Sequence, residues 1–431
     1  MISRQLRKYF AHSEELDLAK LTTLSYKIAT DAPANAEDIA IELARVVTER
    51  LPSRIEYMPI SDGGISVLDI SRNAQWTQFT MAISDLYWRP EDGLPSLLEL
   101  AISMAEYDYA SGIWLSNIDI PKHHMSQLGG PRYGISALRE KLEEPIAPIL
   151  AMAFGALRPN FFEQNEESIV RSLVGGVDIL LQDMRMPLGQ WESKESQFRS
   201  VINIRDKARE KSKKDKMILC TLSGTPYQML REAEKFLHLG GDGFVINATT
   251  SGFGLLEDLR RLFPKAFITT TNMGSGLWSR PFDKVAVQRA GLDELVISKF
   301  SRLAGADAVH AGTAGTNCFD AEWSPSITAL SCDISLPQNS FLEKSWRVAE
   351  GDLRQTAIWK NLQVLGNDSI LTIPSQTLFK GDAKKIAASW REVSSVMSQI
   401  SDYDEASNAY VKIANKNRSV REELESGNVV K

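Results

Sequence analysis

The feature of this sequence that most constrains its fold is an alternation, starting near Pro148, of short apolar runs and longer amphipathic stretches. The runs are too short for helices and are typical of strands buried on both faces. They lie at 148–157, 177–183, 216–222, 243–248, 266–271, 306–312, 345–350 and 368–373. Stretches with helical spacing lie between them, as at 226–239, 253–263, 293–303 and 356–365. Eight strand–helix units predict a (β/α)8 TIM barrel, which carries its chemistry on the loops after the strands.

The second apolar run has the clearest boundaries. It follows Gly175 and Gly176, which end a predicted helix at 161–174 where a left-handed cap is needed. It then ends in polar residues, among them Asp183. Polar side chains at the carboxyl end of a buried parallel strand stand where such a barrel places its active site.

A small α+β domain of ferredoxin-like type is predicted ahead of the barrel. Strands are expected at 21–28, 55–58, 65–70, 78–86 and 112–120, and helices at 36–50 and 94–107. The predicted division is 1–130 for this N-terminal domain, 131–400 for the barrel and 401–431 for a charged, peripheral C-terminal tail.

Composition narrows the partners. A net charge of −6 and a pI near 5.6 argue against nucleic acid. The Lys/Arg run at 205–216 alternates with acidic residues and is interpreted as a solvated helix end. Three widely spaced cysteines fit a reducing cytoplasm. Neither a signal peptide nor a membrane-length apolar run is recognised, so a cytoplasmic protein without membrane contact is expected.

Three segments share their pattern with one family. Gly175-Gly-Val-Asp-Ile-Leu-Leu-Gln-Asp-Met184 resembles the metal-binding strand of the RuBisCO large-chain superfamily, Gly-Gly-x-Asp-Phe-x-Lys-Asp-Asp-Glu. Residues 129–139 are similar to its linker, Gly-Pro-x-x-Gly-Ile-x-x-x-Arg. Residues 302–313 match Arg-Leu-x-Gly-x-Asp-x-x-His-x-Gly-Thr. The resemblance covers about residues 20 to 400 and implies a divergent RuBisCO-like protein of form IV type.

The resemblance implies a lost metal site. In the family the Lys is carbamylated and holds Mg²⁺ together with an Asp and the Glu. Here Leu181 and Met184 stand at the Lys and the Glu, and Asp183 is kept. Because Mg²⁺ needs hard oxygen ligands, no cofactor is expected, and Asp183 is the single candidate ligand if magnesium binds.

The remaining strand ends depart from the family in the same way. Arg158 replaces a proton-moving Lys; it is a poor base but can hold an anion, or else it pairs with Asp183. Thr271 stands at a family His and Asn317 at the Lys of the mobile loop. His310 is retained, and the resemblance makes it a phosphate contact, with a satisfied core histidine as the other interpretation.

Two phosphate-binding turns are also altered. Glu350 and Asp352 fall in the family's Ser-Gly-Gly, where carboxylates would repel a phosphate. Ser375 follows a proline in place of the family's Gly-Gly-Gly, with Lys380 nearby as a candidate cation. Asn247 is expected to be structural or to support the site. The resemblance implies a homodimer or an assembly of dimers, in which Glu42 reaches the partner's active site.

Two functional hypotheses stay open. One is a RuBisCO-like protein without carboxylase activity, whose rebuilt barrel-mouth pocket takes a small sugar-like or phosphorylated metabolite. If active, it would be an isomerase or lyase acting at an enolisable carbon. The other is a non-catalytic pseudoenzyme that serves as a dimeric scaffold or partner-binding protein. The catalytic candidates are Arg158, Asp183, His310 and Glu350. The substrate-binding candidates are Glu42, Asn247, Thr271, Asn317, Asp352, Ser375 and Lys380.

Overall fold

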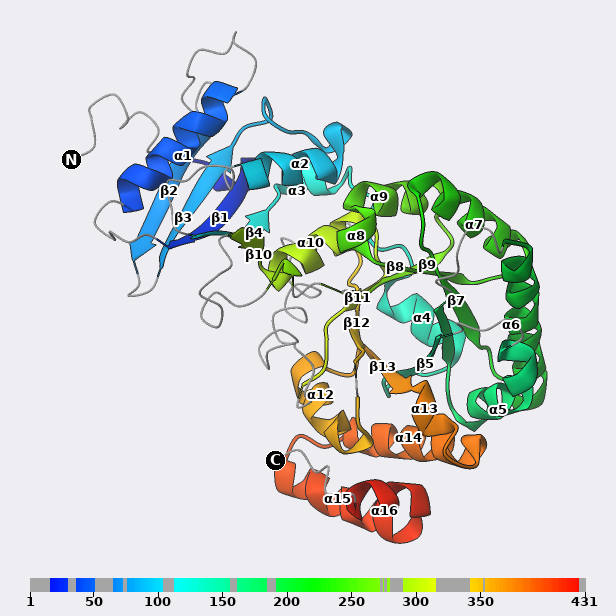
Figure 1. Cartoon of the computed structure of the whole chain (residues 1–431). Helices are drawn as coiled ribbons and strands as arrows, with labels where there is room; N and C mark the ends of the chain where they lie inside the picture. The colour runs from blue at the N-terminus through cyan, green and yellow to red at the C-terminus, as the bar shows by residue number, and fades with distance from the viewer. Residues whose placement is uncertain are drawn as a thin grey trace.

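The structure is a computed structural model (Figure 1). It describes residues 16–29, 36–50, 65–72, 76–103, 112–155, 161–183, 191–271, 274, 277–279, 290–314, 342–351 and 353–425. Of residues 36, 46–50, 155, 182–183 and 191–193 it describes the backbone alone. The strand expected at 55–58 lies outside these residues.

The chain from residue 149 to residue 374 forms a closed barrel of eight parallel strands. Its strands are β5 (Ile149–Gly155), β6 (Ile179–Asp183), β7 (Met217–Thr221), β8 (Gly243–Ile246), β9 (Phe267–Thr270), β11 (Ala308–His310), β12 (Trp346–Ala349) and β13 (Ser369–Pro374). They are paired in the circular order β11-β12-β13-β5-β6-β7-β8-β9. Each predicted apolar run overlaps one of these strands, and β13 extends one residue past its run, so the predicted barrel is confirmed.

Helices surround the barrel (Figure 1). They are α5 (Phe161–Gly175), α6 (Trp191–Ser212), α7 (Pro226–His238), α8 (Ala248–Ser251), α9 (Phe253–Leu262), α10 (Glu294–Ala304), α12 (Ile358–Leu365), α13 (Ser375–Leu378) and α14 (Ala383–Met397). Local signals set their starts. At α7, Thr225 and Gln228 form a reciprocal capping box, with Pro226 as the first residue of the helix. At α14, the Asp382 carboxylate accepts hydrogen bonds from the amides of Lys384 and Lys385.

The barrel interior is filled by every second strand residue, as the two-residue period of a strand requires. The inward side chains form one apolar cluster of Ile149, Ala151, Ile179, Leu181, Met217, Leu219, Val245, Phe267, Ala308, Trp346, Val348 and Ile370. Helix α4 (Gly134–Leu142) closes the amino-terminal end of the barrel with Leu138 and Leu142. The Trp346 indole donates a hydrogen bond to the Gly134 carbonyl, at 3.2 Å. The carboxyl end is therefore the end left for chemistry.

An aspartate stands immediately before each of four alternate barrel strands, namely Asp178, Asp242, Asp307 and Asp368. Three of them accept a hydrogen bond from the second amide of the preceding strand, at 2.8 to 3.0 Å. Each also pairs with an arginine from outside the barrel, in the order Arg391, Arg205, Arg260 and Arg139. These pairs fix the stagger of adjacent strands and satisfy strand amides at the base of the barrel.

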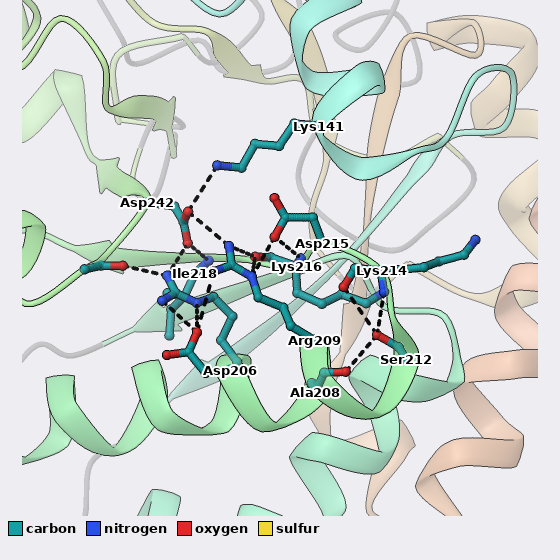
Figure 2. A network of polar contacts seen from close by, with 12 residues as sticks. Lys141, Asp206, Ala208, Arg209, Ser212, Lys214, Asp215, Lys216, Ile218 and Asp242 are labelled. Carbon is teal, nitrogen blue, oxygen red and sulfur yellow. Dashed lines mark hydrogen bonds and ion pairs between the residues drawn. The ribbon is translucent and has the colours of Figure 1, made fainter.

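Figure 2 shows one of these centres. The Asp242 carboxylate forms ion pairs with Arg205 at 2.7 Å, Lys141 at 3.3 Å and Arg209 at 3.5 Å. Arg205 is 5% exposed and Lys216 is 2% exposed. Lys216 donates a hydrogen bond to the backbone carbonyl of Val177, at 2.7 Å. The interpretation of residues 205–216 as a solvated helix end is therefore wrong for these two cations, which are buried against the base of the barrel.

The N-terminal domain is built on an antiparallel sheet. Its elements are β1 (Thr22–Ala29), α1 (Ala36–Arg50), β2 (Ile65–Arg72), β3 (Thr77–Ile83), α2 (Gly93–Ile102), β4 (Gly112–Asp119) and α3 (Lys122–Met125). The order β4-β1-β3-β2 is ferredoxin-like. A short strand, β10 (Ala290–Leu292), follows β9 in the sequence but belongs to the N-terminal sheet, where it pairs in parallel with β4.

Polar contacts join the domains beside β10. The Lys27 ammonium lies 2.8 Å from the Asp293 carboxylate. Lys299 of α10 donates to the side chain of Asn117, at 2.7 Å, and to the carbonyl of Ile118, at 2.9 Å. The orientation of the small domain on the barrel is thus set by several charged groups.

The C-terminal segment is helical over α15 (Tyr403–Lys416) and α16 (Arg418–Glu425), outside α14 (Figure 1). Tyr410, Ile413 and Val420 are buried in this packing. The Glu423 carboxylate accepts a hydrogen bond from the Gln355 amide, at 2.7 Å, in the loop that follows β12. This tail therefore reaches a loop at the carboxyl end of the barrel. None of the described helices is long and apolar enough to cross a membrane.

Candidate functional site at the carboxyl end of the barrel

Strand alternation determines which side chains face the barrel mouth. Val245, Ala308 and Val348 belong to the interior cluster. The same two-residue period, continued one step, brings Asn247, His310 and Glu350 to the mouth. Thr269 pairs with the interior Ala308, and Thr271 follows it by two residues. The same period therefore brings Thr271 to the mouth. The period therefore predicts that four of the candidate residues lie at the carboxyl ends of four adjacent strands, β8, β9, β11 and β12.

His310 occupies the centre of this group. It is the last residue of β11 and is half-buried, and its amide lies 3.4 Å from the Thr270 hydroxyl. It stands at the level of Val348 on β12, and Glu350 follows two residues later. A carboxylate and an imidazole thus come from neighbouring strands. This combination can supply both a base and an acid.

The loops behind His310 and Glu350 are tied together. The Thr313 hydroxyl donates a hydrogen bond to the Gly351 carbonyl, at 2.7 Å. Asn361 accepts from the Ala314 amide, at 2.9 Å, and donates to the Ala314 carbonyl, at 3.0 Å. Gly351 has a φ of +110°, a conformation that a side chain would strain. These contacts hold the strand ends that carry the two candidate groups.

The position of the family's carbamylated lysine is apolar. Leu181 is 7% exposed, and it lies between Ala153 of β5 and Leu219 of β7 in the strand register. Hydrocarbon on this side of the mouth offers no ligand to a hard cation. Asp183 ends β6 opposite Gly155, and its side chain lies outside the described part. Met184 also lies outside it.

The structure also describes the surroundings of Asn247, Glu42, Ser375 and Lys380. Asn247 accepts from the Thr249 hydroxyl, at 2.7 Å, and its carbonyl takes the Ser251 amide, at 2.9 Å, where α8 begins. Glu42 on α1 is held by Arg45, which lowers the pKa of its carboxyl. Ser375 begins α13, and Lys380 is exposed beyond it. Arg158, Asn317 and Asp352 lie outside the described residues.

Sequence reasoning missed Thr372. It is 4% exposed on β13, two residues after the interior Ile370, and it pairs with the interior Ala151. Its hydroxyl has no hydrogen-bond partner among the residues that the structure describes. A buried, unpaired hydroxyl is costly and calls for an explanation. The two-residue period counted from Ile370 could have found it.

The retained motif residues are mostly part of the scaffold. Arg302 donates to the Glu343 carbonyl, at 2.9 Å. Asp307 accepts from the amides of Arg132 and Tyr133, at 2.7 and 2.8 Å. Arg139 donates to three carbonyls, those of Glu144, Ala147 and Asn367, and to Asp368. Of the motif at 302–313, His310 alone stands at the mouth. The motif match therefore indicates a shared barrel scaffold more than a shared reaction.

The fold and these motifs define the class of protein. The model of the "Ribulose bisphosphate carboxylase large chain, catalytic domain" matches residues 134–336. The dimeric archaeal Rubisco of Hyperthermus butylicus superposes with a TM-score of 0.81 at 17% identity, over 99% of this chain and 100% of that chain. The octameric enzyme of Pyrococcus horikoshii gives 0.82 at 17% identity, over 96% of each chain. Residues 134–336 thus match the RuBisCO large-chain catalytic domain, and the chain is similar at low identity to RuBisCO and RuBisCO-like proteins.

Curated relatives are distant. The ribulose bisphosphate carboxylase of Methanocaldococcus jannaschii is 23% identical over 275 residues, which is 61% of this chain and 63% of that protein. A protein of Shouchella clausii named as a candidate 2,3-diketo-5-methylthiopentyl-1-phosphate enolase is 23% identical over 223 residues, 50% of this chain and 56% of that protein. The matched part thus spans less than two thirds of either relative.

Proposed function

We propose that this protein has no ribulose-bisphosphate carboxylase activity and that its barrel mouth binds a small sugar-like or phosphorylated metabolite. The reaction would be of the isomerase, enolase or lyase type, at a carbon beside a carbonyl. The observation that carries this proposal is Leu181, which faces the apolar barrel interior where the family has its carbamylated lysine. Leucine has no amine to carbamylate.

The residues at the mouth suit proton transfer. Enolisation requires a base to take a proton from carbon and an acid to protonate the oxygen. Glu350 and His310 come from adjacent strands and are of the right chemical types. The hydroxyls of Thr271 and Thr372 can hold substrate oxygens, because a hydroxyl both donates and accepts. Arg158 and Asp183 complete the proposed set of site residues, and Arg158 would bind an anionic group of the substrate.

One relative supports this class of chemistry. The Shouchella clausii protein is named for enolisation of a diketo phosphate, and the match extends over 50% of this chain. That substrate carries a carbonyl, an acidic carbon and a phosphate. It is therefore the first probe to use, with ribulose bisphosphate as the second.

The test is exchange of substrate protons with solvent deuterium, followed by NMR. We expect exchange with a diketo or ketose phosphate, and losses of about 10²- to 10⁴-fold in His310→Asn and Glu350→Gln. His238→Asn, an exposed change on α7, is the control. Labelled carbon dioxide should not enter a sugar bisphosphate. Incorporation of label would overturn the proposal, and so would exchange that both variants retain.

A non-catalytic role as a dimeric scaffold is the second candidate. It is favoured by the replacement of the family's metal-binding Lys and Glu by Leu181 and Met184. Two structural neighbours are named as dimeric and octameric. We propose a homodimer or an assembly of dimers in either case, in a cytoplasmic location. Dimers in light scattering, with no exchange for any probe, would favour the scaffold; a monomer at micromolar concentration would contradict the assembly.

A further inference from the structure

Three metal-ligating side chains of the N-terminal domain lie together, on the segments that follow β3 and β4. Strands β3 and β4 flank β1 and run antiparallel to it, so they run in the same direction as each other. Their last residues, Ile83 and Asp119, pair with Thr22 and Thr23 at the start of β1. The segments that follow both strands therefore emerge at the same end of the sheet, with β1 between the two strands.

Asp85 follows β3, and His123 and His124 lie on α3 after β4. The His124 Nε2 atom is 3.4 Å from one Asp85 oxygen, and the His123 Nε2 atom is 3.9 Å from the other. The two imidazole rings are 4.1 Å apart between centroids. One ligand atom from each of the three residues lies within 4.8 Å of the others.

These separations fit a metal ion better than direct pairing. A hydrogen bond between nitrogen and oxygen is about 2.7 to 3.2 Å long, shorter than either contact. Bonds of about 2.0 to 2.1 Å around a tetrahedral metal place neighbouring ligand atoms roughly 3.3 to 3.4 Å apart. The His124–Asp85 contact already has this separation, and half-exposed His123 is free to approach by a small rotation.

The burial of the three residues is also that of a built site. His124 is 3% exposed, and its ring meets the edge of Trp88 at 5.7 Å between centroids. Its Nδ1 atom is buried with no hydrogen-bond partner among the described residues, and its Nε2 atom faces Asp85. One ligand is thus fixed in the core, while Asp85 and His123 stand about half open to solvent, where an ion and a water can enter.

We propose that Asp85, His123 and His124 form a binding site for a divalent transition metal of the zinc class, with water as the fourth ligand. Two imidazole nitrogens and one carboxylate are a zinc-type donor set, and magnesium prefers oxygen ligands alone. A bound ion would join the loop after β3 to α3. The chain then runs to Gly130, whose amide bonds to the Leu303 carbonyl at 3.1 Å, so the site braces the entry to the barrel.

The test is zinc binding by the full-length protein after dialysis against a chelator. Calorimetry should show one zinc per chain, and zinc should raise the melting temperature because it binds the folded state alone. Cobalt in its place should give the visible absorption of a tetrahedral site. Magnesium should do neither. Asp85→Asn and His123→Gln alter half-exposed side chains, so folding is expected to survive in both.

We expect each variant to bind zinc more than about tenfold more weakly than the wild type. His238→Gln removes an exposed histidine elsewhere and should bind as the wild type does. Circular dichroism and the metal-free melting temperature check that the variants are folded. Absence of zinc uptake by the wild type would overturn the proposal. Uptake of equal affinity in Asp85→Asn and His123→Gln would overturn it too.

Discussion

Arg260 on α9 and Asp307 before β11 form an ion pair in which both side chains are at most 1% exposed. The same guanidinium donates to the carbonyls of Gly305, at 2.9 Å, and Ala266, at 3.0 Å. The Asp307 carboxylate also accepts the Ile268 amide, at 2.8 Å. Every polar atom of the pair thus has a role in joining the helix layer to the base of the barrel.

Removing one partner of this pair should be severely destabilising. Arg260→Met leaves the Asp307 charge buried without its cation, which typically costs about 3 to 5 kcal/mol. The adjacent Arg261→Met is a matched control. Its pair with Asp258 is exposed, and such pairs contribute less than about 1 kcal/mol. Urea denaturation measures both, and equal effects of the two changes would contradict the buried pair's importance.

Magnesium should not stabilise this protein measurably at millimolar concentration. Leu181 supplies no ligand, and Mg²⁺ gives up its water shell reluctantly. A ligand that binds the folded state must raise the melting temperature, so the absence of a shift is informative. A magnesium-dependent rise that disappears in Asp183→Ala would show that the mouth retains a metal site.

Most of the barrel could be predicted because its strands are short apolar runs buried on both faces. The polar loops between them do not show this pattern. Strand β10 could not, since three residues carry no periodic signal and it pairs with a strand far away in sequence. The misinterpretation of Arg205 and Lys216 has a similar cause. Mixed charge predicts solvent exposure, and the Asp242 and Asp178 that bury these cations come from other segments.

The candidate site could be predicted in position but not in detail. Motif alignment located His310 and Glu350, and strand alternation then places them at the mouth. The motif could not show that Arg302 and Asp307 are scaffold, because a family pattern records both kinds of residue. Thr372 was missed because the family motifs do not mark it, although the two-residue period counted from the interior Ile370 points to it.

Stability should depend on pH through Glu423 of the C-terminal helix. Burial raises the pKa of its carboxyl. The hydrogen bond from the Gln355 amide and the nearby Arg354 and Lys380 lower it, and burial is the larger effect. The folded chain therefore holds this proton to higher pH than the unfolded chain. Its contribution to stability is full below the ordinary carboxyl pKa of 4.5 and is lost as the pH rises through the folded-state value.

Glu423→Gln keeps an acceptor for the amide and cannot ionise. Its free energy of unfolding relative to the wild type should therefore increase as the pH is raised above about 4.5. Glu422→Gln removes an exposed charge from the same helix and serves as the control. Denaturation at several pH values gives both differences. A difference for Glu423→Gln that falls with pH would show that the carboxylate is favoured in the folded chain.

Two buried threonines, Thr372 on β13 and Thr313 in the loop after β11, should respond oppositely to the same substitution. Thr372→Val replaces a hydroxyl that has no partner among the described residues, and burying an unpaired hydroxyl costs about 1 to 3 kcal/mol. This variant should be at least as stable as the wild type. Thr313→Val removes the hydrogen bond to the Gly351 carbonyl and should lose about 1 kcal/mol, the usual contribution of such a bond.

Ligand binding then separates a site hydroxyl from a packing defect. If Thr372 holds a substrate oxygen, Thr372→Val will weaken binding of the phosphorylated probe while the unliganded protein stays as stable as before. The measurements are thermal melting without ligand and calorimetry with it. Unchanged affinity in Thr372→Val would remove this residue from the site. A loss of stability equal to that of Thr313→Val would mean that the hydroxyl does have a partner in the folded chain.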